Sequence, residues 1–292
     1  MEILILQVLN ALFYAAILYL IASGFTLIFG VMGIANMAHG SFYAVGAFVT
    51  AWVVGALDGA GIHPVLLLLV LPVGAIAVAM LGMALEPTLL RPFYRRAEEY
   101  QLLLTFGLLL IIEDGLHFIF GGYPMSADAP LAAMGGVPIF SFRYPTYNFL
   151  VIAVSVVTAI ALWASIHRTR FGVMLRATSQ NRKMASALGI NVGRVYTFAF
   201  GIGSFLAGLG GAIIVPTQTA ALGMGLDALI IAFVVVAIGG IGSQLGALVG
   251  ALIVAFVRTA GVHFFPEVEL AVLFLMAACV LLWRPTGLLA RS

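Results

Sequence analysis

The chain has 292 residues, of which 63% are hydrophobic and only 8% are charged, and its mean hydropathy is +1.19. A soluble domain carries about 25% charged residues because its surface faces water, so this composition excludes a soluble globule and predicts a surface that faces lipid. The net charge of +2 gives no basis for nucleic-acid binding, and a single cysteine, Cys279, excludes a disulfide framework or a cysteine-based metal site within the chain.

In chain order, apolar windows long enough to cross about 30 Å of hydrocarbon lie at 5–30, 41–57, 64–85, 102–120, 147–166, 196–215, 225–241, 245–262 and 268–283. We therefore predict an all-α, polytopic integral membrane protein of about nine (eight to ten) transmembrane helices, forming one domain over residues 1–292. Glycine and polar residues interrupt the runs at 30–41 and 239–246. Broken backbone at membrane depth persists only inside protein or beside a cavity, so both breaks are candidates for the functional centre as well as for simple turns.

Basic residues are concentrated in three gaps between or after these windows. Eleven of the 13 lysines and arginines fall there: Arg91, Arg95, Arg96, Arg168, Arg170, Arg176, Arg182, Lys183, Arg194, Arg284 and Arg291. The positive-inside rule places such gaps in the cytoplasm. The other connections carry mainly acidic residues, namely Asp58, Asp128, Glu267 and Glu269 beside Arg143. The prediction is a bacterial inner-membrane protein with its N-terminus outside and its C-terminus in the cytoplasm.

Two connections are long enough to have structure of their own. The outer one, at about 121–146, is rich in glycine and proline and is predicted to form an irregular or short-helical cap. The inner one, at about 167–195, has apolar residues at helical spacing with basic residues between them, which predicts a short amphipathic helix over 173–189. Gly189 is expected to end that helix.

Several kinds of chemistry are excluded by the motifs. The only lysine, Lys183, follows no glycine-rich loop, so the chain has no P-loop for ATP. No nucleophile motif and no clustered cysteine and histidine are present either, so we predict neither an enzyme nor a cofactor or metal site. The five histidines are scattered, and all but His39 are expected to be interface or interhelical hydrogen-bonding residues.

The first break places Asn36, His39, Gly40 and Ser41 between two strongly apolar runs. One interpretation is a capped cytoplasmic turn, in which Asn36 and Ser41 satisfy free backbone groups. The other is a broken helix that lines a translocation path. The residues alone leave both open, and these four are candidate path residues.

The second break and an acidic pair supply the other candidates. Gly242, Gly246 and Gly250 recur at four-residue spacing, which favours close helix packing, while Gly239 and Gly240 beside them are candidate path residues. A loose echo between Gly40-Ser41 and Gly242-Ser243 suggests a possible internal repeat. Glu113, next to Asp114, is a further path candidate because ionisable groups at membrane depth are costly. Asp227, at the outer start of its span, is expected to be a carboxylate favoured by the helix dipole.

The inner amphipathic helix has two possible uses. A protein without an ATP site that displays a basic helix to the cytoplasm is expected to dock a separate soluble partner. The alternative is a helix that rests on anionic lipid headgroups. The Ser, Gln and Asn content of the segment and its lack of bulky aromatic residues favour the protein partner.

These stretches resemble the membrane subunits of branched-chain amino-acid ABC importers, a group that also includes permeases for sugars, nucleosides, urea and amides. The similarity covers nearly the whole chain. It is carried, in order, by Asn36-Met-Ala-His39-Gly40, Thr169-Arg-Phe-Gly172, Arg176-Ala177, Ala185-Ser-Ala-Leu-Gly189-Ile190-Asn191, the glycines from Gly239 to Gly250, and Arg284-Pro285-Thr-Gly287-Leu.

The resemblance implies a permease subunit that forms half of a path for branched-chain or related apolar amino acids. It would pair with a second, similar permease subunit in a heterodimer, with two cytoplasmic ATPases that bind the ATP, and with a periplasmic binding protein. The implied ATPase-coupling residues are Arg176, Ala177, Arg182, Ala185, Leu188, Gly189, Ile190 and Asn191. The segment departs from the Glu-Ala-Ala form of other ABC permeases, because it has Ala185-Ser186-Ala187 before Gly189.

Two alternatives remain. Within the same class, the solute is urea, a short amide or another small molecule, since the binding protein usually dictates specificity. From another class, a secondary transporter or channel would require paired intramembrane ions or a proton relay, for which Glu113 and Asp114 are the only candidates that the windows suggest.

Overall fold

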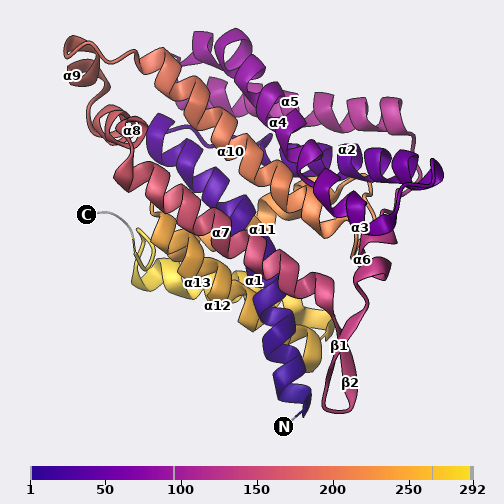
Figure 1. Ribbon diagram of the computed structural model, residues 1–292. Coiled ribbons are helices and arrows are strands. Elements are labelled where there is room, and N and C mark those ends of the chain that lie inside the picture. Colours follow the sequence, from indigo (N-terminus) through magenta and orange to yellow (C-terminus); the bar gives the residue numbers. More distant parts are fainter. Residues whose placement is uncertain (1, 95, 265, 290–292) are drawn as a thin grey trace.

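The computed structural model describes residues 2–94, 96–264 and 266–289 (Figure 1). Within these ranges, eight helical segments are long and apolar enough to span a membrane: α1 (Glu2–Met32), α2 (His39–Gly59), the composite segment Pro64–Phe93, α5 (Glu98–Phe120), α7 (Thr146–Arg168), α10 (Val192–Ile214), α12 (Gln244–Phe264) and Pro266–Trp283. A ninth apolar helix, α11 (Met224–Gly239), has 16 residues. The prediction of an all-α, polytopic membrane protein with about nine helices is confirmed.

Two windows differ from their helices in length. Helix α11 rises about 24 Å, less than the hydrocarbon thickness, because glycines at 223 and 240 with positive φ bound it. The third span runs beyond residue 85 and changes helix type along its length, as α3 (Pro64–Leu67), the 3₁₀ turn η1 (Leu68–Val70), α4 (Pro72–Leu85), the π turn η2 (Glu86–Leu90) and the 3₁₀ turn η3 (Arg91–Phe93). Prolines lack the N–H of a regular helix, and Pro72 and Pro87 stand at two of these changes. Arg91 therefore ends a span instead of lying in a loop; Arg95 and Arg291 lie outside the described residues.

The core is built where α1, α2 and α4 pack on α10, the most buried span (Figure 1). Small residues make these contacts close. The backbone of Gly208 on α10 meets Gly46 of α2, and that of Gly203 meets Gly24 of α1, with no room for a Cβ atom on Gly46 or Gly24. Helix α12 packs on α1 and α11, whereas α5, α7 and α13 (Glu269–Trp283, after the 3₁₀ turn η4, Pro266–Val268) are mostly exposed to the surroundings. Glycine-mediated approach is the usual way for membrane helices to pack closely.

The outer connection forms one end of the molecule. It contains α6 (Ala129–Met134), as the short-helical prediction expected, and then a two-stranded hairpin that was not predicted, β1 (Gly136–Ile139) and β2 (Phe142–Pro145). The hairpin turns at Phe140 with φ 54°, a conformation that favours glycine or asparagine, so the residue type gave no turn signal. The Ser141 hydroxyl donates to the Glu2 carboxylate, which places the start of α1 at the same end.

The inner connection lies at the opposite end (Figure 1). The predicted single helix over 173–189 is wrong: two helices are present, α8 (Arg170–Gln180) and α9 (Arg182–Ala187). The chain breaks at Asn181, whose extended backbone lets its side chain accept the Met184 N–H at 3.0 Å as an N-cap. Gly189 ends α9 as expected. It takes φ 84°, and the following N–H of Ile190 donates to the Ala185 carbonyl at 3.0 Å, as in a Schellman motif.

Candidate functional site

The first break returns the chain into the membrane before α2 begins. The His39 Nε2 atom lies 3.0 Å from the carbonyl oxygen of Ile21, and the His39 ring packs edge-on against Phe25 at 5.5 Å. Ile21 precedes the end of α1 by 11 residues, about 16 Å along the helix axis. Helix α2 therefore starts well inside the bundle, so the break is deeper than a surface turn.

The polar groups of this break are only partly satisfied. Asn36 Oδ1 accepts the Ala38 N–H at 3.1 Å, which is the turn contact that the capped-turn interpretation expected. Ser41 makes no such contact. Among the described residues, Asn36 Nδ2, His39 Nδ1 and Ser41 Oγ have no hydrogen-bond partner, although all three side chains are fully buried. Buried polar groups without partners destabilise a fold, so these three atoms form a costly polar cluster within the core.

Two predicted candidates meet at the start of α11. Gly40 of α2 packs directly on Gly225, where a Cβ atom would lie 2.9 Å from the Gly40 oxygen. From the other side, the Glu113 carboxylate of α5 accepts the N–H of Gly223, which precedes α11 with φ 87°. A neighbouring backbone donor thus satisfies the Glu113 carboxylate. Residues far apart in sequence therefore hold one helix start at membrane depth.

A cavity of about 190 Å³ opens beside this helix start. Helix α1 contributes mainly aliphatic lining to it, whereas α11 contributes Asp227 and α12 contributes Arg258. A larger hollow of about 680 Å³ shares Tyr14, Gln218 and Arg258 with it and extends to Gln7, near the N-terminal end of α1. We call the two together the outer cavity. Arg258 was not predicted as a site residue, although a lone arginine inside an apolar window is a signal that could have found it.

The second break is a packing centre in this structure. Gly246 and Gly250 of α12 lie against Gly239 and Val235 of α11, and Gly242 touches Gly30, so close packing is confirmed for the predicted glycine series. The two breaks thus contact each other. The chain after α13 closes over them, because the Leu288 and Leu289 N–H groups donate to the carbonyls of residues 238 and 239 at 2.8 and 2.9 Å.

The candidate path residues have a common environment. Asn36, His39, Gly40, Ser41, Gly239 and Gly240 are all buried between helices in the single chain, and Glu113 is partly buried. Their place on a translocation path stays a prediction.

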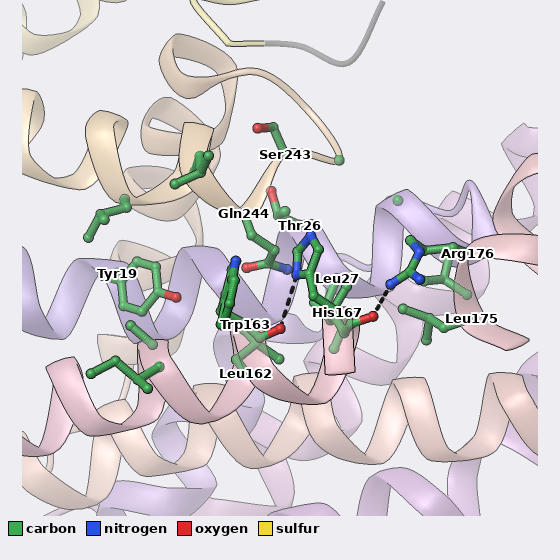
Figure 2. A pocket seen from close by; sticks show the side chains of 18 residues that line it. Tyr19, Thr26, Leu27, Leu162, Trp163, His167, Leu175, Arg176, Ser243 and Gln244 are labelled. Atoms are coloured by element: carbon green, nitrogen blue, oxygen red, sulfur yellow. Dashed lines mark hydrogen bonds between the residues drawn. The ribbon is translucent and has the colours of Figure 1, made fainter. Parts of the chain in front are cut away.

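A second cavity, of about 450 Å³, lies between α1, α7, α8 and α12 toward the opposite end (Figure 2). We call it the inner cavity. Its lining is largely apolar, and its polar side chains are those of Tyr19, Thr26, His167, Arg176, Ser243 and Gln244. Gln244 Nε2 donates to the Ser23 carbonyl at 3.2 Å. Arg176, an expected coupling residue, faces this cavity and donates to the Ile166 carbonyl at the end of α7.

The other expected coupling residues, apart from Ala177 in α8, lie in a protruding tip that consists of α9 and residues 188–191. Arg182, Leu188, Gly189 and Asn191 are exposed, Ala177 and Ile190 are half-buried, and Ala185 is buried. Leu188 is 74% exposed and Met184 is 58% exposed, beside the basic pair Arg182 and Lys183. An apolar tip with basic neighbours is suited to a protein contact.

A buried carboxylate that the sequence analysis missed links this tip to the bundle. Glu86 is fully buried and accepts hydrogen bonds from Arg91 Nη2 at 2.7 Å, Thr197 Oγ1 at 2.6 Å and the Tyr94 hydroxyl at 2.8 Å. Burial and then the hydrogen bond to Glu86 raise the pKa of Tyr94. Arg91 also donates to the Gly193 carbonyl at 3.1 Å. The end of the third span is thereby tied to the first turn of α10, which follows the tip directly.

These features define a class of protein: a multi-pass membrane permease, with cavities flanking its first helix from both ends. The described residues contain no group of three or more histidine, cysteine, aspartate or glutamate residues that could hold a metal ion. Residues 7–281 match the family model described as the permease component of branched-chain amino acid transport systems, and the chain belongs to this family. It is a permease subunit of an ABC importer, a class that works with ATPase and binding-protein partners.

Three relatives indicate the range of the family. The high-affinity branched-chain amino acid transport system permease protein LivH of Escherichia coli (strain K12) is 30% identical, over 98% of this chain and 95% of the relative. The corresponding permease protein BraD of Pseudomonas aeruginosa is 27% identical over the same shares. The ribose import permease protein RbsC of Haemophilus influenzae is 29% identical, over 87% of this chain and 76% of the relative.

Proposed function

We propose that this chain forms half of the translocation path of an importer for branched-chain or related apolar amino acids. The observation that carries the proposal is end-to-end similarity to LivH and BraD, whose names specify branched-chain amino acids. The smaller part of the outer cavity supports it, because its aliphatic residues, beside a single aspartate and a single arginine, suit an apolar amino acid.

The proposed assembly has four kinds of partner. The chain, acting as one transmembrane domain over residues 1–292 in the lipid bilayer, pairs with a second permease subunit as a heterodimer, with two cytoplasmic ATPases and with a periplasmic binding protein. The ATPases bind the ATP, so this subunit needs no cofactor. It performs no covalent chemistry on the substrate, and nucleic acid is not among its proposed partners. The tip formed by α9 and residues 188–191 docks in the ATPase. Its exposed Met184 and Leu188 support this role.

The proposed mechanism is alternating access. ATP-driven closure of the ATPases pushes the tip, and the contacts of Arg176 with α7 and of Glu86 with α10 pass this motion into the spans. The outer and inner cavities then open in turn. This requires the N-terminal end of α1 to face the periplasm and α8 and α9 to face the cytoplasm of the inner membrane.

The orientation is testable with single cysteines in a Cys279→Ser background. Ser141 lies in the hairpin and Ser186 lies in α9, and both are exposed. In intact cells with a permeable outer membrane, an impermeant maleimide is expected to label Ser141→Cys and to spare Ser186→Cys until the cells are opened. The reverse pattern contradicts the proposed orientation.

The substrate is tested by reconstitution. The complete transporter in proteoliposomes is expected to accumulate L-leucine only when ATP and the loaded binding protein are present. Uptake by this chain alone would favour a secondary transporter. The similarity to RbsC makes ribose the comparison solute, and urea tests the amide alternative. A transporter that moves ribose or urea and excludes leucine contradicts the proposed substrate.

A further inference from the structure

We propose that Asp227 and Arg258 form a binding site for the two charged ends of an α-amino acid within the outer cavity. Asp227 takes the ammonium group, Arg258 takes the carboxylate, and the aliphatic side chain lies against Ile17, Ile21 and Ile231. This inference rests on the proposed function and adds the residues that recognise the substrate class.

The first support is the arrangement of opposite charges around one cavity. Asp227 on α11 and Arg258 on α12 line the same cavity of about 190 Å³. In the part of the chain that the structure describes, they do not form an ion pair with each other, and Asp227 makes no side-chain hydrogen bond or ion pair. Two opposite charges held apart at the edges of a cavity are complementary to a small zwitterion between them.

The Arg258 guanidinium is fixed in position and still has N–H groups that can bind a ligand. Its guanidinium lies over the ring of Tyr14, 4.5 Å from the ring centroid, and its only ion-pair partner among the described residues is Glu269 at 3.6 Å. No hydrogen bond from its side chain forms to a described residue. A planar guanidinium can bind a carboxylate through two parallel N–H groups, and one fixed by stacking on an aromatic ring loses little freedom when it does so.

Two contacts hold the start of α11 and thereby fix the position of Asp227. It lies in the first turn of α11, which Glu113 holds through the N–H of Gly223 and on which Gly40 packs at Gly225. Its side chain is exposed in the single chain, although the neighbouring residues of the cavity include Ile17 and Ile21 in the middle of α1. A carboxylate at this depth is costly in contact with lipid, so a polar occupant of the cavity is the favourable solution.

The remaining lining fits the rest of the substrate. Ile17, Leu18, Ile21 and Ile231 offer an aliphatic surface, and the larger hollow leads from Arg258 past Asn10 and His263 to the N-terminal end of α1. In the proposed orientation, that end receives substrate from the binding protein. A sugar or urea would bring no ammonium group to Asp227 and no carboxylate to Arg258, so the site also selects against those solutes.

The first experiment measures coupled transport by the complete reconstituted transporter. Asp227→Asn keeps the side-chain size and removes the charge, and Arg258→Gln removes the charge with a shorter side chain. Each is expected to lower [³H]leucine uptake about 10- to 100-fold, the cost of one charge-assisted contact, while ATP hydrolysis stimulated by the loaded binding protein persists. The matched controls are Asp58→Asn and Arg143→Gln, which lie outside the cavity and should transport normally. Uptake at the wild-type rate by either cavity variant overturns the inference.

The second experiment uses only the wild-type complex, so it does not depend on how the variants fold. Binding of [³H]leucine to the purified complex without binding protein is challenged with 4-methylpentanoate, which lacks the ammonium group, and 3-methylbutylamine, which lacks the carboxylate. Each is expected to compete at least about tenfold more weakly than unlabelled leucine. Equal competition, or no leucine binding by a complex that transports leucine, overturns the site. A complex that transports no amino acid at all would instead overturn the proposed function.

Discussion

Glu86 and Arg91 form an ion pair whose two members are unequally buried, and this asymmetry leads to a prediction. The Glu86 carboxylate is fully buried, whereas the Arg91 side chain is 41% exposed. Arg91→Met leaves a buried carboxylate with only Tyr94 and Thr197 as donors and should cost about 3–5 kcal/mol. Glu86→Gln leaves a guanidinium that can reach solvent, so its cost should be nearer about 1 kcal/mol. Apparent Tm values of the purified subunit in detergent should therefore fall more for Arg91→Met, and equal shifts would contradict this account.

Glycines on α2 provide a second prediction, with a control in the same helix. A Cβ atom at Gly40 would overlap the backbone of Gly225 on α11, whereas one at Gly55 would meet no atom within 4 Å. Gly40→Ala should therefore displace the start of α11, and with it Asp227, and should lower leucine uptake by about tenfold or more through a shift of about 1 Å. Gly55→Ala should transport normally. Normal uptake by both variants would show that the contact between α2 and α11 does not position the outer cavity.

At the scale of whole elements, the tip after α8 carries the prediction for coupling. Leu188→Asp places a charge on a side chain that is 74% exposed, so the fold should be unaffected while the apolar contact with the ATPase is lost. The expected result is normal insertion and Tm of the subunit, loss of ATPase co-purification and loss of uptake. Val137→Asp, in the hairpin at the opposite end, is the matched control because Val137 is also exposed. Uptake and ATPase recovery that survive Leu188→Asp would remove the tip from the coupling path.

The elements also mark what residue patterns can and cannot predict. Apolar windows located the helices because lipid requires long apolar runs, and Gly189 marked the end of α9 because only a positive φ fits there. The continuation of the third span to Phe93 was missed, since Glu86 and Arg91 look like loop residues until each is seen to satisfy the other. The meeting of Gly40, Glu113 and Gly223 at α11 depends on three-dimensional packing and leaves no local signal.

At the scale of the whole molecule, α1 is the element that both cavities share. The outer cavity reaches it from Gln7 to Ile21, and the inner cavity reaches it from Tyr19 to Val31. Just beyond the stretch that the outer cavity reaches lie Ser23 and Gly24, where the Ser23 carbonyl accepts from Gln244 and the backbone of Gly203 packs on Gly24. In the proposed mechanism, small movements of α10 and α12 against this closely packed region open one side and close the other.

Alternating access at these cavities is therefore expected to change the accessibility of two positions in opposite directions. Asn10→Cys reports on the outer cavity and Gln244→Cys on the inner one, each in a Cys279→Ser background and in the complete transporter. Trapping the ATPases with ATP and vanadate should raise the labelling rate of one cysteine and lower that of the other, because a bistable packing cannot leave both sides open. Ser141→Cys in the hairpin should label at one rate throughout. Rates at the two cavity positions that rise or fall together would contradict alternating access about α1.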